Sequence, residues 1–144
     1  MSYGCVDALY VIDERPASIY VEAYKEAEEH KWIESEKRGH DAGHHAIREW
    51  YRVHWAHYCR RKRLEHIQGR RRWDEFGDEN FGRFHPHILD DDLLVDRILD
   101  RFYAGMENLE LIKWALDWGL PTDRVVEILS EVDMNRARLE PDLD

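Results

Sequence analysis

Apolar side chains recur along this chain at steps of three and four residues, the spacing that places them on one face of an α-helix. The first such stretch covers residues 17–38, with Pro16 where a helix could begin and Gly39 where it could end. Its inward stripe would consist of Ile19, Tyr20, Ala23, Tyr24, Ala27 and Ile33. We therefore expect one long helix over residues 17–38.

A second, longer helix is predicted after Asp41, a residue type that favours N-caps, and it should end at Gly69. About 27 residues of helix would reach roughly 40 Å, whereas a compact chain of this size has a radius of gyration of about 15 Å. The helix should therefore cross the domain or protrude from it. Two of its faces carry large side chains: Ala46, Trp50, Val53, His57, Arg60, Leu64 and Ile67 on one, and Ile47, Tyr51, Trp55 and Tyr58 on the other. Such a helix needs neighbours on two sides.

The second half of the chain predicts a loop followed by three shorter helices. Residues 73–87 contain two Phe-Gly steps and a proline without a helical period, which indicates an ordered loop anchored by its aromatic side chains. Gly105 and the turn at Gly119 separate the helices that follow. Their apolar positions are Leu93, Leu94, Ile98, Leu99 and Phe102, then Leu109, Ile112, Ala115, Leu116 and Trp118, then Val125, Val126, Ile128, Leu129 and Val132.

Together these stretches predict an all-α fold of about five helices in a single domain. The two long helices should be antiparallel, and the aromatic loop should pack between the two halves. Residues 1–15 should form an N-terminal arm, and residues 139–144 a frayed tail.

The last two helices have the spacing of a helix-turn-helix unit, with a small residue, a turn glycine and apolar positions that seat the second helix: Ala115, Gly119, Leu120, Val125 and Ile128. A DNA-reading helix offers basic and amide side chains to phosphates and base edges. The outward positions here are instead Asp123, Arg124, Glu127, Ser130 and Glu131. We therefore expect an ordinary packed corner that resembles the DNA-binding motif in geometry only.

Composition limits the class of protein. The chain has 144 residues, of which 43% are hydrophobic and 12% aromatic, enough for one core. The only two cysteines, Cys5 and Cys59, argue against a disulfide framework. No basic segment leads into an apolar one at the N-terminus, and no apolar run is long enough to span a membrane. We therefore expect a cytoplasmic protein without a membrane partner.

The net charge of −10 is unevenly distributed, because residues 48–73 carry a charge of +7 between two acidic regions. This basic centre could bind an anion, or it could pair with acidic residues of the same or a second chain, such as Asp90–Asp92, Asp96 and Asp100. We favour the second interpretation. The alternative is nucleic-acid binding, with Trp73 stacking on a base. Its cationic residues would be Arg60, Arg61, Lys62, Arg63, Arg70, Arg71 and Arg72.

Nine histidines raise the question of a metal site. Glu26 and His30 are four residues apart, as are His40 and His44, and this spacing can place two ligands on one helical face. These four residues are the candidate ligands for a transition metal such as zinc. Gly39 should interrupt the helix before His40, however, so the favoured expectation is a protein without a metal or other cofactor.

The sequence favours a non-catalytic protein. It contains no glycine-rich phosphate loop, no dinucleotide fingerprint and no nucleophile elbow. The thiol of Cys59 lies on the expected core helix, where cysteines are more often inert.

Three stretches resemble segments of small uncharacterised bacterial proteins: EHKWIESEKRGHDAG, then AIREW and LEHIQG, then ENLELIKWALDWGLP. The resemblance extends over much of residues 29–121. It implies no function and transfers no catalytic or binding residue.

The leading functional hypothesis is a helical interaction or assembly protein that self-associates or docks on a protein partner. The second long helix is longer and more widely apolar than so small a domain is expected to cover. Aromatic side chains dominate interface energetics. The expected partner-binding residues are therefore Trp50, Tyr51, Trp55 and Tyr58.

Overall fold

A computed structural model describes residues 17–85 and 93–142 of the chain. Within these ranges the fold is all-α, as predicted, and contains no β-strand apart from an isolated bridge between Ala17 and Trp73. The helices are α2 (Ile19–Arg38), α3 (Gly43–Ile67), α4 (Leu93–Tyr103), α5 (Asn108–Asp117) and α6 (Thr122–Val132), with two short 3₁₀ helices, η1 (Asp74–Phe76) and η2 (Met134–Ala137). The predicted arm at residues 1–15 and the Asp90–Asp92 run lie outside the described residues.

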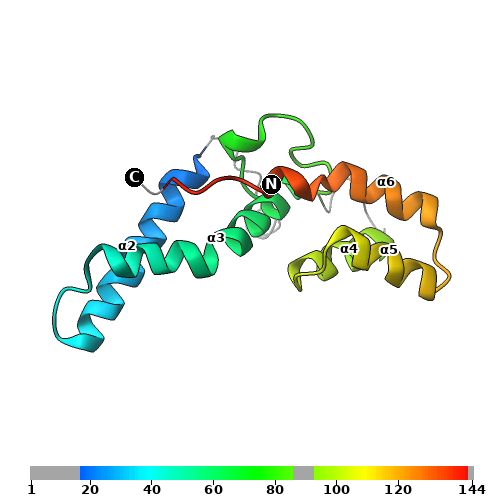
Figure 1. Cartoon of the computed structure of the whole chain (residues 1–144). Helices are drawn as coiled ribbons and strands as arrows, with labels where there is room; N and C mark the ends of the chain where they lie inside the picture. Colours follow the sequence, from blue (N-terminus) through cyan, green and yellow to red (C-terminus); the bar gives the residue numbers. More distant parts are fainter. Residues whose placement is uncertain (1–16, 86–92, 143–144) are drawn as a thin grey trace, which may run out of the picture.

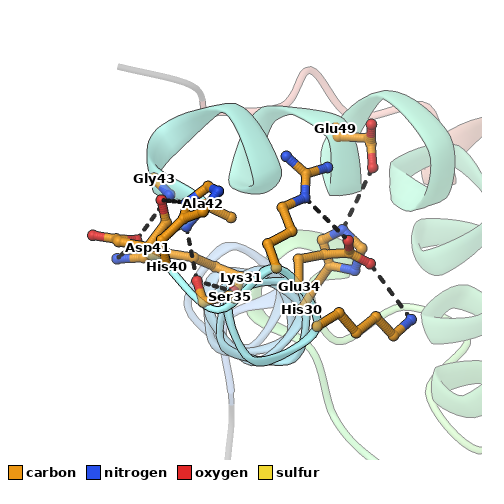
Figure 2. Close-up of polar contacts among 11 residues, drawn as sticks. His30, Lys31, Glu34, Ser35, His40, Asp41, Ala42, Gly43 and Glu49 are labelled. Carbon is orange, nitrogen blue, oxygen red and sulfur yellow. Dashed lines mark hydrogen bonds and ion pairs between the residues drawn. The ribbon is translucent and has the colours of Figure 1, made fainter.

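The two long helices form a hairpin, and α4, α5 and α6 lie toward the opposite end of the molecule (Figure 1). Gly39 ends α2 in the left-handed conformation, and its N–H donates to the Ser35 carbonyl at 2.9 Å. Asp41 is not the N-cap of α3, because the helix begins one residue later and Ala42 occupies that position. The Asp41 carboxylate still accepts the N–H of Gly43, at 2.8 Å (Figure 2).

Residues of the same chain cover much of α3. The small side chains of Ala23 and Ala27 lie buried on α2, which allows the two helices to approach closely. On another side the C-terminal segment runs back toward the start of α2 (Figure 1). The indole N–H of Trp55 donates to the Leu139 carbonyl at 2.7 Å, and the Tyr20 hydroxyl donates to the Glu140 carbonyl at 2.8 Å. The expected fraying of this tail is therefore wrong for these residues.

Two arginines near the end of α3 hold the C-terminal ends of other helices. The Arg60 guanidinium donates to the carbonyls of Phe102 and Met106, at 3.1 and 2.8 Å, where α4 ends. Arg63 is fully buried and donates from Nε to the carbonyl of Val132, the last residue of α6, at 2.8 Å. A cation at a helix C-terminus is favoured by the helix dipole. These contacts fix α4 and α6 against α3.

The burial of Arg63 has an energetic cost. Neither of its Nη atoms has a hydrogen-bond partner among the described residues, although the guanidinium lies over the ring of Phe76 at 5.2 Å. Burial, and secondarily the charge of Arg136, lowers the pKa of Arg63 to about 10. The side chain is therefore still cationic at neutral pH.

The described part of the aromatic loop, residues 73–85, is ordered, as predicted, and winds around His66 at the end of α3. Its Trp73, Phe76 and Phe84 side chains are buried. The Trp73 N–H donates to Nδ1 of His66 at 3.1 Å, and the ring of Phe76 lies edge-on to the imidazole at 5.4 Å. Because Nδ1 accepts this hydrogen bond, the buried imidazole is neutral.

The loop also connects the two ends of the molecule. The carboxylate of Glu75 accepts the N–H of Ile19 at 2.7 Å and the hydroxyl of Ser18 at 2.8 Å, and so caps the start of α2 from 56 residues away. On its other side Asn80 donates to the carbonyl of Glu131 in α6, at 2.9 Å. The loop thus packs between the hairpin and the C-terminal helices, as predicted.

His66 should make stability depend on pH. Burial, and then the positive charges of neighbouring arginines, lowers its pKa from 6.5 to about 4. Between these values the unfolded chain binds a proton that the folded chain does not. The free energy of unfolding should therefore decrease as the pH falls through this window, by up to about 3 kcal/mol.

Urea unfolding across this pH window, for the unsubstituted protein and for His66→Asn, tests the prediction. Asparagine keeps an acceptor for the Trp73 N–H but binds no proton, so His66→Asn should flatten the pH dependence. His44→Asn, at an exposed position in the first turn of α3, is the control. A slope that is equally steep in the His66→Asn variant would contradict the assignment.

Candidate functional site

The four aromatic residues expected to bind a partner do not form an exposed surface. Trp50, Tyr51 and Trp55 are buried within the single chain, and Tyr58 is partly buried against the same core. They pack on one another, with the rings of Trp50 and Tyr58 5.4 Å apart and those of Tyr51 and Trp55 5.5 Å apart. This burial removes the reason for which these residues were expected to contact a partner.

The basic segment is largely neutralised or stacked within the chain. Arg60 pairs with Glu107 at 2.9 Å rather than with Asp96 or Asp100. Arg63 is buried, Lys62 pairs with Glu65 at 3.2 Å, Arg71 lies over the Trp73 ring at 5.3 Å, and Arg72 pairs with Asp78. Only Arg61 and Arg70 of the seven cations are classed as exposed. The segment therefore presents much less positive charge than its sequence suggests.

The candidate metal ligands are not brought together. Within residues 17–85 and 93–142, no three His, Cys, Asp or Glu side chains lie close enough to hold a metal ion. His30 is 3.7 Å from Glu49 of α3, whereas His40 lies in the turn beyond Gly39 and contacts the Asp41 carbonyl at 3.2 Å (Figure 2). The proposed set of Glu26, His30, His40 and His44 is therefore wrong, because the end of α2 separates its members.

The predicted corner between α5 and α6 is present. The Leu120 N–H donates to the Ala115 carbonyl at 2.9 Å, and Gly119 takes a positive φ of 65° that closes the turn. Ala115 and Val125 are buried at the contact between the two helices. The outward positions of α6 are largely acidic, as in the sequence, so the corner itself offers little to a phosphate backbone.

The structure shows an exposed apolar surface on α5, formed by residues that the sequence analysis grouped with the other apolar positions of this helix. Leu111 and Ala115 form the buried stripe of this helix, but Leu109 and Leu116 are 69% and 62% exposed. Trp118, in the turn that follows, is 73% exposed. We call Leu109 and Leu116, which are seven residues apart and lie on one face of α5, the α5 outer surface. Its signal in the sequence is that α5 carries apolar residues on two opposite faces.

Acidic side chains accompany the α5 outer surface. Glu110 and Asp117 lie on α5 and Asp123 lies at the start of α6, all exposed. Lys113, four residues after Leu109 and three before Leu116, is the only basic residue within α5 and lies on the same face as the two leucines. Residues 93–132 together carry eight acidic and four basic residues. The α5 outer surface is thus apolar, with one lysine beside it and an excess of acidic side chains around it.

Substitution of two adjacent arginines tests whether the basic segment contains both structural and merely exposed cations. Arg60→Ala removes the donor to the carbonyls of Phe102 and Met106 and should lower the free energy of unfolding by about 1–3 kcal/mol. Arg61→Ala removes the same charge from an exposed neighbour and should change it by less than about 0.5 kcal/mol. Urea unfolding measures both, and equal losses would contradict a structural role for Arg60.

Comparisons with known proteins leave the function to be argued from these residues. No helix in the described parts of the chain combines the length and apolar character needed to cross a membrane. The chain matches no model of a protein family, no curated protein and no solved structure. The resemblance to small bacterial proteins therefore stays a prediction.

Proposed function

We propose that this chain is a non-catalytic, cytoplasmic protein-interaction module that docks a partner through the α5 outer surface. The partner segment would be an amphipathic helix with an apolar face and basic margins. The observation that carries the proposal is the second apolar stripe of α5, because one buried stripe is enough to fix a helix on its core. A free, buried Cys59 thiol agrees with a reducing compartment.

Burial of the α5 outer surface would supply substantial binding energy. Covering a leucine side chain is worth about 1.5–3 kcal/mol, and Leu109 and Leu116 are both more than half exposed. Two leucines seven residues apart on one helix match the spacing at which helices present anchors to one another.

Charge favours a basic partner over a second copy of the chain. In a two-fold dimer the same surface meets itself, so Glu110 and Asp117 of the two copies would approach one another, with only one Lys113 from each copy to offset them. The net charge of −10 adds a general repulsion between copies. Lysine or arginine at the margins of a partner helix would instead pair with these carboxylates.

Nucleic-acid binding through the basic segment has less support. Five of its seven cations are buried, paired or stacked within the chain, which leaves Arg61 and Arg70 exposed. Two separated cations supply little of the charge neutralisation on which phosphate-backbone binding depends.

Binding of a labelled amphipathic peptide built from leucine and lysine tests the proposal by fluorescence anisotropy. Leu116→Glu places a charge in the α5 outer surface and should weaken binding at least about tenfold. Val53→Glu is the matched control, because Val53 is also about half exposed but lies on α3. Equal weakening by the two substitutions would contradict the proposed surface.

The polarity of the partner is tested separately. A leucine–glutamate peptide should bind weakly to the unsubstituted protein and better to a Glu110→Lys, Asp117→Lys variant, because the sign of the margin is reversed. Light scattering coupled to size exclusion reports self-association. A dimer that Leu116→Glu dissolves would assign the surface to a second copy and contradict the choice of a basic partner.

A further inference from the structure

A cavity of about 290 Å³ lies along α3, and none of its lining residues belongs to the α5 outer surface. One residue of α2, Glu26, contributes to its wall, and the other lining residues come from a single stretch of α3. They are Trp50, His54, His57, Tyr58, Arg61, Lys62 and Glu65. The cavity therefore gathers titratable side chains of both signs over an aromatic base.

Three hydrogen-bond donors occupy one side of this cavity. His54, His57 and Arg61 follow one another at steps of three and four residues, which aligns them along one face of α3. All three are exposed. Arg61 has no ion-pair partner within 4 Å among the described residues, so its guanidinium fork is open to a ligand.

The neighbouring side chains make contacts within the chain, so Arg61 is the cation of this cavity that can donate to a ligand. The ammonium group of Lys62 lies 3.2 Å from Glu65 and 4.8 Å from the ring centre of Tyr58. The Trp50 ring packs against His54 at 5.8 Å and against Tyr58 at 5.4 Å. The base of the cavity is thus rigid, and the imidazole of His54 is oriented by packing.

The electrostatic potential differs between the two ends of the cavity. Burial, followed by the positive charges of Arg61 and Arg60 and by His54, lowers the pKa of His57. At the other end burial, followed by the carboxylates of Glu26, Glu22 and Glu65, raises the pKa of Tyr58. The charges that act on His57 are thus positive, whereas carboxylates and Lys62 surround Tyr58. We call the part of the cavity formed by His54, His57 and Arg61 its positive end.

We propose that the positive end of this cavity binds the phosphate group of a small phosphate monoester, with Arg61 as the charged donor and His54 and His57 as imidazole donors. A guanidinium can donate two parallel hydrogen bonds to one phosphate, and imidazole N–H groups can donate to its remaining oxygens. The carboxylate of Glu26 opposes negative charge at the far end. The ligand therefore carries its charge on one terminal phosphate and not along a polyphosphate chain.

The charges around His57 give binding a defined pH dependence. Arg60, Arg61 and His54 on α3 disfavour its protonation, while Glu26 of α2 lies on the opposite wall. A bound phosphate offsets the positive potential and stabilises the imidazolium. Saturating ligand should therefore raise the pKa of His57.

Histidine-ring NMR titrations with inorganic phosphate and with ethyl phosphate, at constant ionic strength in chloride, test the assignment. Both probes should give saturable shifts of the His54 and His57 ring signals. Arg61→Ala should weaken binding at least about tenfold, the loss expected for one charge-assisted hydrogen-bonding group. Arg52→Ala, which removes the same charge from another exposed position of α3, should leave the affinity unchanged.

Two further measurements complete the test. Glu26→Gln removes the opposing carboxylate and should tighten ethyl phosphate binding several-fold. Shifts that do not saturate, or equal losses in Arg61→Ala and Arg52→Ala, would show a general ionic effect and overturn the proposal. An oligothymidylate that binds more tightly than ethyl phosphate at equal phosphate concentration would overturn the assignment to a small ester. None of these outcomes depends on the α5 outer surface.

Discussion

The arrangement of this molecule depends on two arginines one helical turn apart on α3. Arg60 and Arg63 donate to backbone carbonyls where α4 and α6 end, so two helix C-termini converge on one short stretch of a third helix. The C-terminus of α6 offers Arg63 a carbonyl and a favourable dipole, which partly offsets the cost of removing its guanidinium from water. Since α5 is joined to α4 and α6 by short turns, these contacts also determine which face of α5 points outward.

Periodicity predicted the helices well but not which of their stripes would be covered. The bounds of α2 and α3 agree with the sequence to within a few residues, because glycine and the end of an apolar pattern act locally. Whether an apolar stripe is buried depends on contacts with residues that are distant in the sequence. On α3 both apolar faces find neighbours, including a carbonyl 84 residues away from Trp55. On α5 the outer leucines find none within the described residues, and nothing in their own spacing distinguishes them from Leu111.

The count of charges along the sequence located the basic segment correctly but overestimated how much positive charge it presents on the surface. The basic centre suggested a broad anion-binding face, yet its cations have separate structural tasks: Arg63 supports α6, and Lys62 is held by Glu65. The local arrangement of His57 and Arg61 next to Glu26 requires α2 and α3 to be side by side, and spacing within one helix contains no such information. The metal prediction was wrong for a related reason, because the four-residue spacing of the candidate ligands continued past the end of a helix.

The return of the C-terminal segment to the hairpin has a consequence for synthesis of the protein. As the chain leaves the ribosome, α2 and α3 are complete long before the carbonyls of Leu139 and Glu140 exist. Until then the indole N–H of Trp55 and the hydroxyl of Tyr20 lack these acceptors, and part of the aromatic core of α3 is uncovered. Residues that follow α6 therefore close a hairpin that is synthesised much earlier, and a chain interrupted before residue 139 would retain an open hairpin that quality-control proteases can recognise.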